Sequence, residues 1–410
     1  MPGPLADLKI LDLTWVLSGP YASMVLCDLG AEVIKVERPP YGDVARTTGP
    51  HLNGESTYFF SINRGKKSAV IDLKRPEGRD LFLRLVEKVD VVMENFTPGT
   101  MAALALDYET LAARNPRLIY AATSGFGQTG PDRLKPALDI VVQGIGGVLS
   151  ITGEDGGGPV RPGLSLADIS AGLFTAIGIL AAVHERERSG HGQMIDVAML
   201  DCQIAVLENA FSRYFATGEP PRPLGTRHPV STPFQAFPTA DGFIVIALGF
   251  GLENAWEVFC ALIGRPDVID DPRFATPGLR TRNHGELEPI ISEGLRQRPT
   301  AAWLSEFEPV GIPCGALNTI PEAAALPQVA AREMLVDVES SRGNRLKVAA
   351  SPLKLSRTGA AIQGGPPSIG EHTREVLHSL LGLSSEEAEA EFSRGAAAEG
   401  RDLPPELTGS

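Results

Sequence analysis

The sequence is poor in cysteine and lacks a long uninterrupted apolar run. Its four cysteines (Cys27, Cys202, Cys260 and Cys314) stand far apart, without a Cys-x-x-Cys pair. This pattern predicts buried free thiols in a reducing cytoplasm, not a disulfide framework. The apolar stretch 169–183 is shorter than the roughly 20 residues that a membrane span needs, so we expect a buried core helix there.

Positive charge is also scarce. The chain has 37 Lys and Arg against 50 Asp and Glu, a formal net charge of −13. This balance argues against a nucleic acid or an anionic membrane as the partner. An anionic small molecule would have to be bound by a local group of cations. The first residues also lack the basic and apolar segments of a signal peptide, so we expect a cytoplasmic protein.

Several motifs of common enzyme classes are missing. The turn after the first predicted strand, residues 14–20, has one glycine where a dinucleotide fingerprint needs three, although Glu37 stands where a ribose-binding acid would. Gly65-Lys-Lys-Ser68 lacks the upstream glycine of a phosphate-binding loop. No His, Cys or carboxylate group has metal-ligand spacing, so we expect no metal site.

The fold class follows from alternating strand and helix patterns in the first part of the chain. Apolar runs at 9–14, 32–37, 68–73, 89–94 and 118–123 predict strands, and helical patterns lie between them. Pro76, for example, stands where the first turn of an amphipathic helix belongs. This order predicts an α/β fold with a parallel sheet.

The length of 410 residues favours two domains. A second long helix is expected at 196–217, followed by a Pro-rich linker at 218–223. We assign 1–222 to a large domain, 223–327 to a smaller one and 328–383 to a return to the large domain. Residues 384–410 are rich in Glu and Ala and predict a loosely held acidic tail.

Cations gather locally at predicted strand ends. The run comprises Arg38, Arg46, Arg64, Lys66, Lys67, Lys74 and Arg75. One interpretation is an ordinary solvated surface. The other is a phosphate-binding rim at strand ends and helix N-termini.

Asp168 also has two interpretations. An Asp just before an apolar helix is a common N-cap. The helix dipole would equally keep this carboxylate ionised, which suits a nucleophile.

A set of short motifs resembles one enzyme family over nearly the whole chain. They include Ile10-Leu-Asp-Leu-Thr14 with Ser18-Gly-Pro20, Leu29-Gly-Ala-Glu-Val-Ile-Lys-Val-Glu37, Asn63-Arg-Gly-Lys-Lys67, Glu94-Asn-Phe-Thr-Pro-Gly99, Asp168 with its helix, Gly190-His-Gly-Gln193, Gly311-Ile-Pro-Cys-Gly315 and Gly370-Glu-His-Thr373. In this order and spacing, the sequence is similar to the class III CoA-transferases of the CaiB/BaiF type.

The resemblance implies a Rossmann-like large domain built from both chain ends, an inserted smaller α+β domain and an interlocked homodimer. It implies Asp168 as the nucleophile and acyl-CoA as substrate, with no tightly bound cofactor. The implied CoA contacts are Val16, Arg38, Ile71, Lys74, Asn95, Phe96 and Lys135. A glycine-containing loop over the active site would fall near residues 249–251.

The chain departs from the family pattern at three places. Thr97 and Ala103 stand where many members have basic residues, which predicts a rearranged set of phosphate contacts. The related acyl-CoA racemases carry a His-Asp pair where this chain has Leu138-Asp139, so one of two bases is missing. We therefore expect CoA transfer between an acyl-CoA such as succinyl-CoA and a carboxylic acid. A racemase and a non-catalytic CoA-binding protein are the alternatives.

Overall fold

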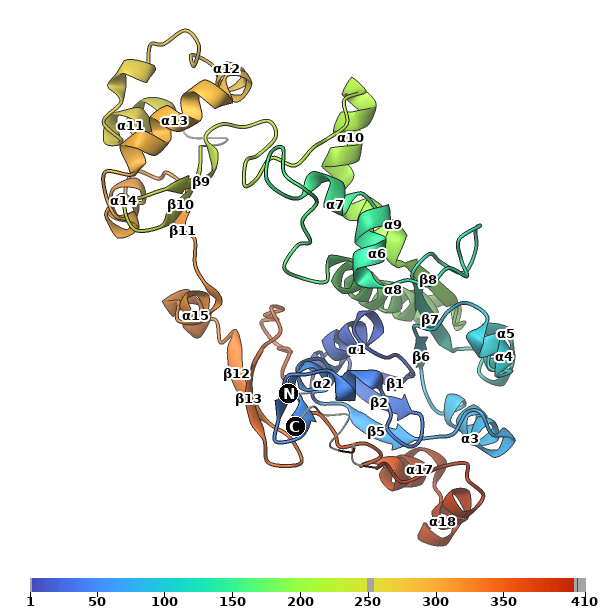
Figure 1. Ribbon diagram of the computed structural model, residues 1–410. Helices are drawn as coiled ribbons and strands as arrows, with labels where there is room; N and C mark the ends of the chain where they lie inside the picture. The colour runs from blue at the N-terminus through green and yellow to red at the C-terminus, as the bar shows by residue number, and fades with distance from the viewer. Residues whose placement is uncertain (1, 249–253, 402–403, 405–410) are drawn as a thin grey trace. The chain divides into compact units, whose positions relative to one another are not determined.

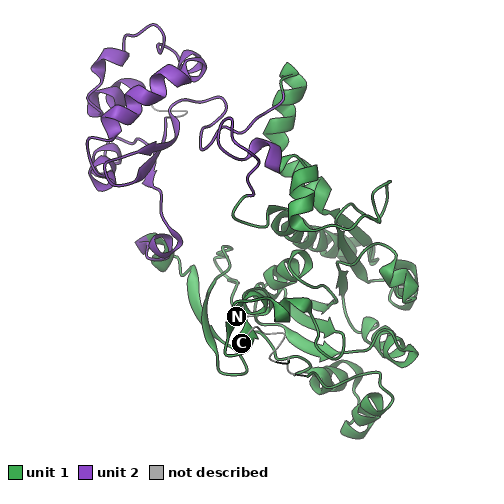
Figure 2. Ribbon diagram, in the orientation of Figure 1, with its two compact units in different colours: residues 1–148, 162–219, 328–410 green, residues 149–161, 220–327 purple. Residues whose placement is uncertain are grey.

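The computed structural model describes residues 2–248, 254–401 and 404. They form two compact units, residues 1–148, 162–219 and 328–410 in one and residues 149–161 and 220–327 in the other (Figure 2). Residues 149–161, which the sequence analysis assigns to the large domain, join the smaller unit. The reason is local pairing: the Gly225 N–H donates to the Gly153 carbonyl, and Arg222 forms an ion pair with Asp155.

A six-stranded parallel sheet forms the centre of the larger unit (Figure 1). Its strands in spatial order are β5 Lys67–Val70, β2 Glu32–Glu37, β1 Lys9–Asp12, β6 Val91–Glu94, β7 Ile119–Ser124 and β8 Met194–Ala198. The predicted α/β fold with a parallel sheet is confirmed.

The sixth strand corrects the sequence analysis. In place of one helix over 196–217, the chain forms β8 and then two helices, α9 Met199–Val206 and α10 Glu208–Thr217. Strand β8 pairs in register with β7. Pairing between residues about 75 positions apart leaves no signal in a local periodicity, so the tertiary contact decides the conformation.

Helices cover both faces of the sheet. One face packs against α3 Pro76–Val86, α5 Tyr108–Arg114, α17 Thr373–Leu381 and α18 Ser385–Ser393. The other packs against α1 Ser18–Asp28 and α8 Leu166–Ser189. Alternate strand residues supply the two cores, with Leu11 and Val92 on the first face and Ile10 and Val91 on the second.

Helix α8 is long and apolar enough to cross a membrane by length and composition, with a mean hydropathy of 2.0. Its Ala176, Ile179 and Ala182 nevertheless pack in the core against the sheet, as the sequence analysis expects. Gly172 brings α8 close to α1, since a Cβ there would lie 2.7 Å from the Ser18 carbonyl oxygen.

The order of the strands creates a crevice. From β1 the chain proceeds to β2 and β5 on one side, and from β6 to β7 and β8 on the other. Strands β1 and β6 are therefore neighbours whose connections leave in opposite directions. Ligands of open parallel sheets bind at such a point, beyond the carboxyl ends of the strands.

The smaller unit has its own core. Strands β9 Phe234–Pro238, β10 Phe243–Ala247 and β11 Cys314–Ala316 form an antiparallel sheet. Helices α11 Ala255–Leu262, α13 His284–Leu295 and α14 Thr300–Phe307 pack on it, with Phe259, Phe274 and Phe307 fully buried.

The remaining elements are short. They are η1 Val44–Thr47, β3 His51–Leu52, β4 Glu55–Ser56, α2 Thr57–Asn63, α4 Thr100–Ala103, α6 Asp139–Ile145, α7 Val148–Ile151, η2 Pro266–Val268, α12 Pro277–Arg282, α15 Ile320–Ala324, α16 Pro327–Ala331, β12 Leu335–Glu339 and β13 Arg345–Ala349.

The expectation of a loosely held tail from residue 384 is wrong for the part that the structure describes. Helix α18 begins with a capping box of Ser384 and Glu387. Beyond it Ala396 and Ala397 are buried in the core, and Ala397 forms a β-bridge with Ile71. Small alanines give little apolar signal in a sequence, but backbone pairing lets them fill the edge of the sheet.

Removal of the tail should therefore destabilise the protein. A chain truncated after Leu383 loses the buried Ala396 and Ala397 and the bond from the Asp72 N–H to the Ala396 carbonyl. The free energy of unfolding should fall by about 3 kcal/mol or more, measured by urea denaturation. The exposed substitution Glu386→Ala is the control and should change it little. Equal stability of the truncated and full chains would contradict this packing.

Candidate functional site

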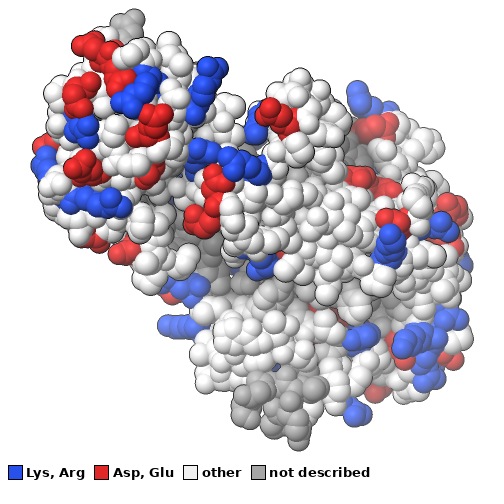
Figure 3. Space-filling view, turned by 45° about the horizontal axis from the view of Figure 1, so that its top comes forward, with Lys and Arg blue, Asp and Glu red and all other residues white. Residues whose placement is uncertain are grey.

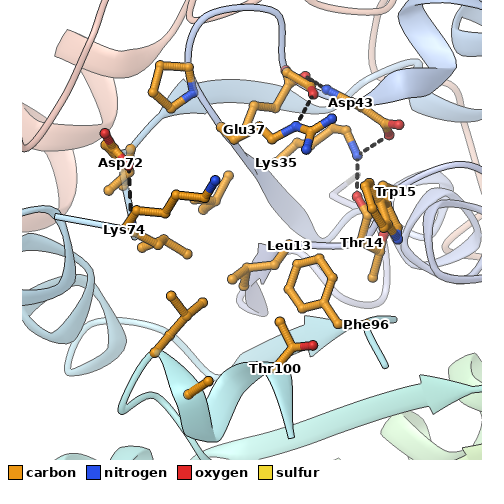
Figure 4. A pocket seen from close by; sticks show the side chains of 18 of the residues that line it. Leu13, Thr14, Trp15, Lys35, Glu37, Asp43, Asp72, Lys74, Phe96 and Thr100 are labelled. Carbon is orange, nitrogen blue, oxygen red and sulfur yellow. Dashed lines mark hydrogen bonds and ion pairs between the residues drawn. The ribbon is translucent and has the colours of Figure 1, made fainter. Parts of the chain in front are cut away.

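A cavity of about 640 Å³ lies at the carboxyl ends of β1, β2, β5 and β6, where the strand connections diverge (Figure 4). Its walls come from the four segments that follow these strands. They contribute Leu13, Thr14 and Trp15; Arg38 and Pro39; Ile71, Asp72, Leu73 and Lys74; and Phe96, Thr97, Thr100, Ala103 and Leu104. The cavity thus combines apolar walls with a few polar groups, as small-molecule sites do.

Four of the sequence-predicted contacts line this cavity together: Arg38, Ile71, Lys74 and Phe96. Figure 4 shows Lys74 reaching toward it from one side, with Phe96 and Thr100 on the other. Thr97 and Ala103, two of the three departures from the family pattern, also lie on this wall. The wall opposite Lys74 therefore carries hydroxyl and apolar groups.

Val16 and Asn95 do not line the cavity themselves, but both contact residues at its edge. The Asn95 side chain accepts a hydrogen bond from the Trp15 N–H and donates one to the Trp15 carbonyl, both 2.9 Å long. Val16 has a φ of 63° and donates its N–H to Asp43. These bonds hold Trp15 at the rim.

Lys135 is not brought to the cavity wall. It lies in the loop after β7 and forms an exposed ion pair with Asp132. Residues 249–251, the expected active-site loop, lie outside the described residues. In the part of the chain that the structure describes, no cluster of three or more His, Cys, Asp or Glu side chains could hold a metal ion.

The cation run divides into two groups. Most members neutralise carboxylates, as in the pairs Arg46–Glu37, Arg64–Asp28, Lys66–Asp12 and Lys67–Glu32. Among the described residues, no carboxylate forms an ion pair with Arg38 or Lys74. The Arg38 guanidinium lies 5.5 Å from the centre of the Trp15 ring. These two cations are therefore available to an anionic ligand.

The floor of the cavity is a buried ion network. Lys35 pairs with Asp43 at 2.9 Å and donates to the Thr14 carbonyl, and both side chains of the pair are almost fully buried. Burial by itself would raise the pKa of Glu37. The positive charges of Arg46 and Lys35 have the larger effect and lower this pKa to about 2. Burial lowers the pKa of Lys66 to about 8, although Asp12 opposes this shift.

Asp168 occupies the third position of α8 and is not its N-cap, which corrects the first interpretation. The helix begins at Leu166 after Ser165. The Ala167 N–H donates to the Asp139 carboxylate at 3.0 Å, and the Asp168 N–H donates to the same oxygen at 3.4 Å. Asp139, from the start of α6, therefore supplies the capping oxygen. Asp168 stands at the positive end of a 24-residue helix, which favours a negative charge.

Packing connects Asp168 with the segment around Trp15. Its neighbour Ile169 packs in a small cluster with Leu17 and Tyr58. Burial, with the charges of Asp168, Asp43 and Asp139, raises the pKa of Tyr58 to about 12, so its hydroxyl stays protonated at neutral pH. The sequence analysis missed Tyr58 and the capping role of Asp139. Both act through contacts with residues far away in the sequence, which no local motif indicates.

Comparisons with known proteins agree with this arrangement. The model of CoA-transferase family III matches residues 5–373. The chain is 42% identical over 355 residues to an acetyl-CoA:oxalate CoA-transferase of Acetobacter aceti, covering 86% of this chain and 90% of that one. It is 41% identical over 384 residues to a succinate–glutarate CoA-transferase of Agrobacterium fabrum, covering 92% and 96%.

A solved structure supports the same conclusion. The crystal structure of a CaiB/BaiF family protein from Brucella suis superimposes with a TM-score of 0.83 at 37% identity, covering 93% of this chain and all of that one. The chain belongs to CoA-transferase family III, and it is a CoA-transferase.

Proposed function

We propose that the protein moves CoA from an acyl-CoA donor to a free carboxylic acid, with Asp168 as the nucleophile. The observation that carries the proposal is the convergence of Arg38, Lys74, Ile71 and Phe96 on one cavity. The cavity lies at the crevice where the fold favours ligand binding. The position of Asp168 at the start of α8 supports its assigned role.

The proposed reaction has balanced covalent steps. The Asp168 carboxylate attacks the thioester carbonyl, which releases CoA thiolate and leaves a mixed anhydride. The thiolate attacks the aspartyl carbonyl, which frees the donor acid and leaves an aspartyl-CoA thioester. The acceptor carboxylate attacks the aspartyl carbonyl of that thioester, which releases CoA thiolate and leaves a second mixed anhydride. The thiolate then attacks the acceptor acyl carbonyl of this anhydride, which forms the new acyl-CoA and frees the Asp168 carboxylate. Covalent catalysis thus divides one transfer into steps between groups of similar reactivity.

The charge distribution suits CoA as the substrate. A protein with a net charge of −13 repels a polyanion at long range. Arg38 and Lys74 would offset this repulsion at the cavity by charge-assisted hydrogen bonds to phosphate oxygens. Trp15 and Phe96, whose rings meet edge to face at 5.9 Å, offer an apolar surface for the adenine.

The named relatives suggest the acids involved. Those described above use acetyl-CoA with oxalate and succinate with glutarate. We therefore propose a short dicarboxylic acid on at least one side of the reaction, with succinyl-CoA as a first donor to test. The family assignment favours transfer over the racemase and the non-catalytic CoA-binding protein.

We also propose that two chains form an interlocked homodimer. Large apolar side chains are exposed along α6, α8 and α10: Leu138, Ile140, Ile145, Leu173, Phe174, Ile177 and Phe215. Figure 3 shows a broad area without charged residues on one face of the molecule. Exposed apolar patches of this kind mark protein interfaces, and a second copy of the chain is the proposed partner.

The Asp168→Asn variant tests the nucleophile. The substitution conserves size, and Asp139 caps the helix in both forms, so the variant should fold normally. Transfer from succinyl-CoA to glutarate should fall by several orders of magnitude, because an amide cannot form the anhydride. New acyl-CoA would be measured by mass spectrometry. Undiminished transfer in a folded variant would exclude Asp168 as the nucleophile.

The Arg38→Ala and Lys74→Ala variants test the CoA site. Loss of one charge-assisted contact costs about 1.5–3 kcal/mol, so each variant should bind CoA at least tenfold more weakly. The loss should shrink at high salt. Lys347→Ala, which removes an exposed lysine paired with Asp337 on β12, is the matched control. Equal CoA affinity in all four proteins, measured by calorimetry, would leave Arg38 and Lys74 as ordinary surface residues.

Sedimentation tests the dimer. Interlocked chains cannot part without unfolding, so the protein should sediment as a dimer even at nanomolar concentration. Dissociation should occur only together with the loss of the circular dichroism signal in denaturant. A reversible equilibrium with a folded monomer would contradict the interlocked arrangement.

A further inference from the structure

Glu94 differs from four other buried carboxylates of the larger unit. Asp12, Asp28, Glu37 and Asp43 each form an ion pair with a lysine or arginine at 3.1 Å or less. Glu94 is 4% exposed and ends strand β6. Among the described residues, no cation pairs with it. A buried carboxylate with only neutral partners is costly, so its position requires an explanation.

Its two partners belong to the cavity wall and the sheet. One oxygen of Glu94 accepts the Phe96 N–H at 2.7 Å, and the other accepts the Tyr120 hydroxyl at 3.2 Å. Phe96 lines the cavity and packs edge to face on Trp15. The Glu94 carboxyl group therefore determines the path of the chain as it turns from β6 into the cavity wall.

Asn95, the next residue, positions the other aromatic side chain of the cavity wall, that of Trp15. Asn95 holds both backbone groups of Trp15 from across the crevice. Glu94 and Asn95 together thus position the aromatic side chains of Phe96 and Trp15. Neither is on the wall itself; each acts through its neighbour.

The surroundings make Glu94 titrate near neutrality. Burial raises its pKa to about 7, although the Phe96 N–H and Tyr120 oppose the shift and Asp196 on β8 adds to it. Tyr120 on β7 keeps its proton, since burial and Glu94 hold its pKa far above the usual range. Tyr108 of α5 packs on Tyr120, and the charges of Asp107 and Glu109 act on Tyr120 in the same direction.

We propose that Glu94 is a positioning residue for the CoA cavity, whose ionised form holds the 95–99 turn in the geometry that binds CoA and whose protonated form loosens it. The inference rests on the proposed function, which places CoA in this cavity. A carboxylate accepts both bonds strongly, because a charged acceptor roughly doubles their strength. Once protonated, the group must donate its own hydrogen, and the Tyr120 oxygen lies within hydrogen-bond distance of Oε1 at 3.2 Å. The Tyr120 hydroxyl then loses its partner.

Ionisation of Glu94 should strengthen CoA binding but lower the stability of the fold. The pKa of Glu94 is higher in the folded chain than in the unfolded one, so its favourable contribution is full below the unfolded pKa, near 4.3. This contribution is lost as the pH rises through about 7. As the pH rises through neutrality, the wild-type protein should therefore bind CoA more tightly while its fold becomes less stable. If Glu94 had a purely structural role, CoA affinity would not rise with pH while the stability of the fold falls.

The test compares CoA binding by calorimetry from pH 5.5 to 8.5 in the wild type and in Glu94→Gln. We expect the wild-type Kd to increase about threefold to tenfold as the pH falls across the titration of Glu94. The variant should keep only the shallower dependence that comes from the CoA phosphates. Repeating the series with dephospho-CoA identifies that ligand contribution. In turnover at each pH, the change should appear in KM for acyl-CoA and not in kcat.

Tyr120→Phe provides a second variant should Glu94→Gln fail to fold. Loss of the hydroxyl donor makes ionisation of Glu94 harder, so the midpoint of the pH dependence should move to higher pH. An unchanged midpoint in a folded Tyr120→Phe protein would overturn the inference. So would a Glu94→Gln profile equal to the wild type, or tighter wild-type binding at low pH, which would indicate simple charge repulsion. Absence of CoA binding at every pH would instead refute the proposed function.

Discussion

The site depends on the burial of charged side chains at the carboxyl end of the sheet. Lys35 and Lys66 have almost no contact with water, and each is opposed by a buried aspartate, Asp43 and Asp12. Removing one member of such a pair leaves an uncompensated charge, which is strongly destabilising. Lys35 thereby holds together the segments that follow β1 and β2, through the Thr14 carbonyl and Asp43. Lys66 holds the end of β1 to the residues just before β5.

The need to neutralise buried carboxylates also explains why the cations near the cavity have different roles. A lysine or arginine that neutralises a buried carboxylate cannot also bind a phosphate strongly. Arg46 and Lys66 are committed in this way, so the ligand is left to Arg38 and Lys74 at the rim. The negative net charge of the protein is thus compatible with an anionic substrate, because Arg38 and Lys74 line the same cavity and, among the described residues, neither forms an ion pair with a carboxylate.

Close packing of α1 and α8 connects the cavity with the proposed nucleophile. Gly172 leaves room for the Ser18 carbonyl, and Ile169 packs on Leu17. Asp139 holds the first turn of α8 from a different element. The position of Asp168 is therefore determined by contacts on both sides of its helix, which suits a group that must meet a substrate at a defined distance.

The sequence by itself determined the strands around β1, β2 and β6, the parallel sheet and the motifs that identify the family, because these are patterns of neighbouring residues. It also singled out Arg38, Lys74 and Asp168 as candidates. Only the tertiary structure decided which cations face the cavity, that β8 is a strand, that the tail is docked and that Asp139 caps α8. Each of these depends on contacts between distant residues, such as Ile71 with Ala397, which local spacing does not encode.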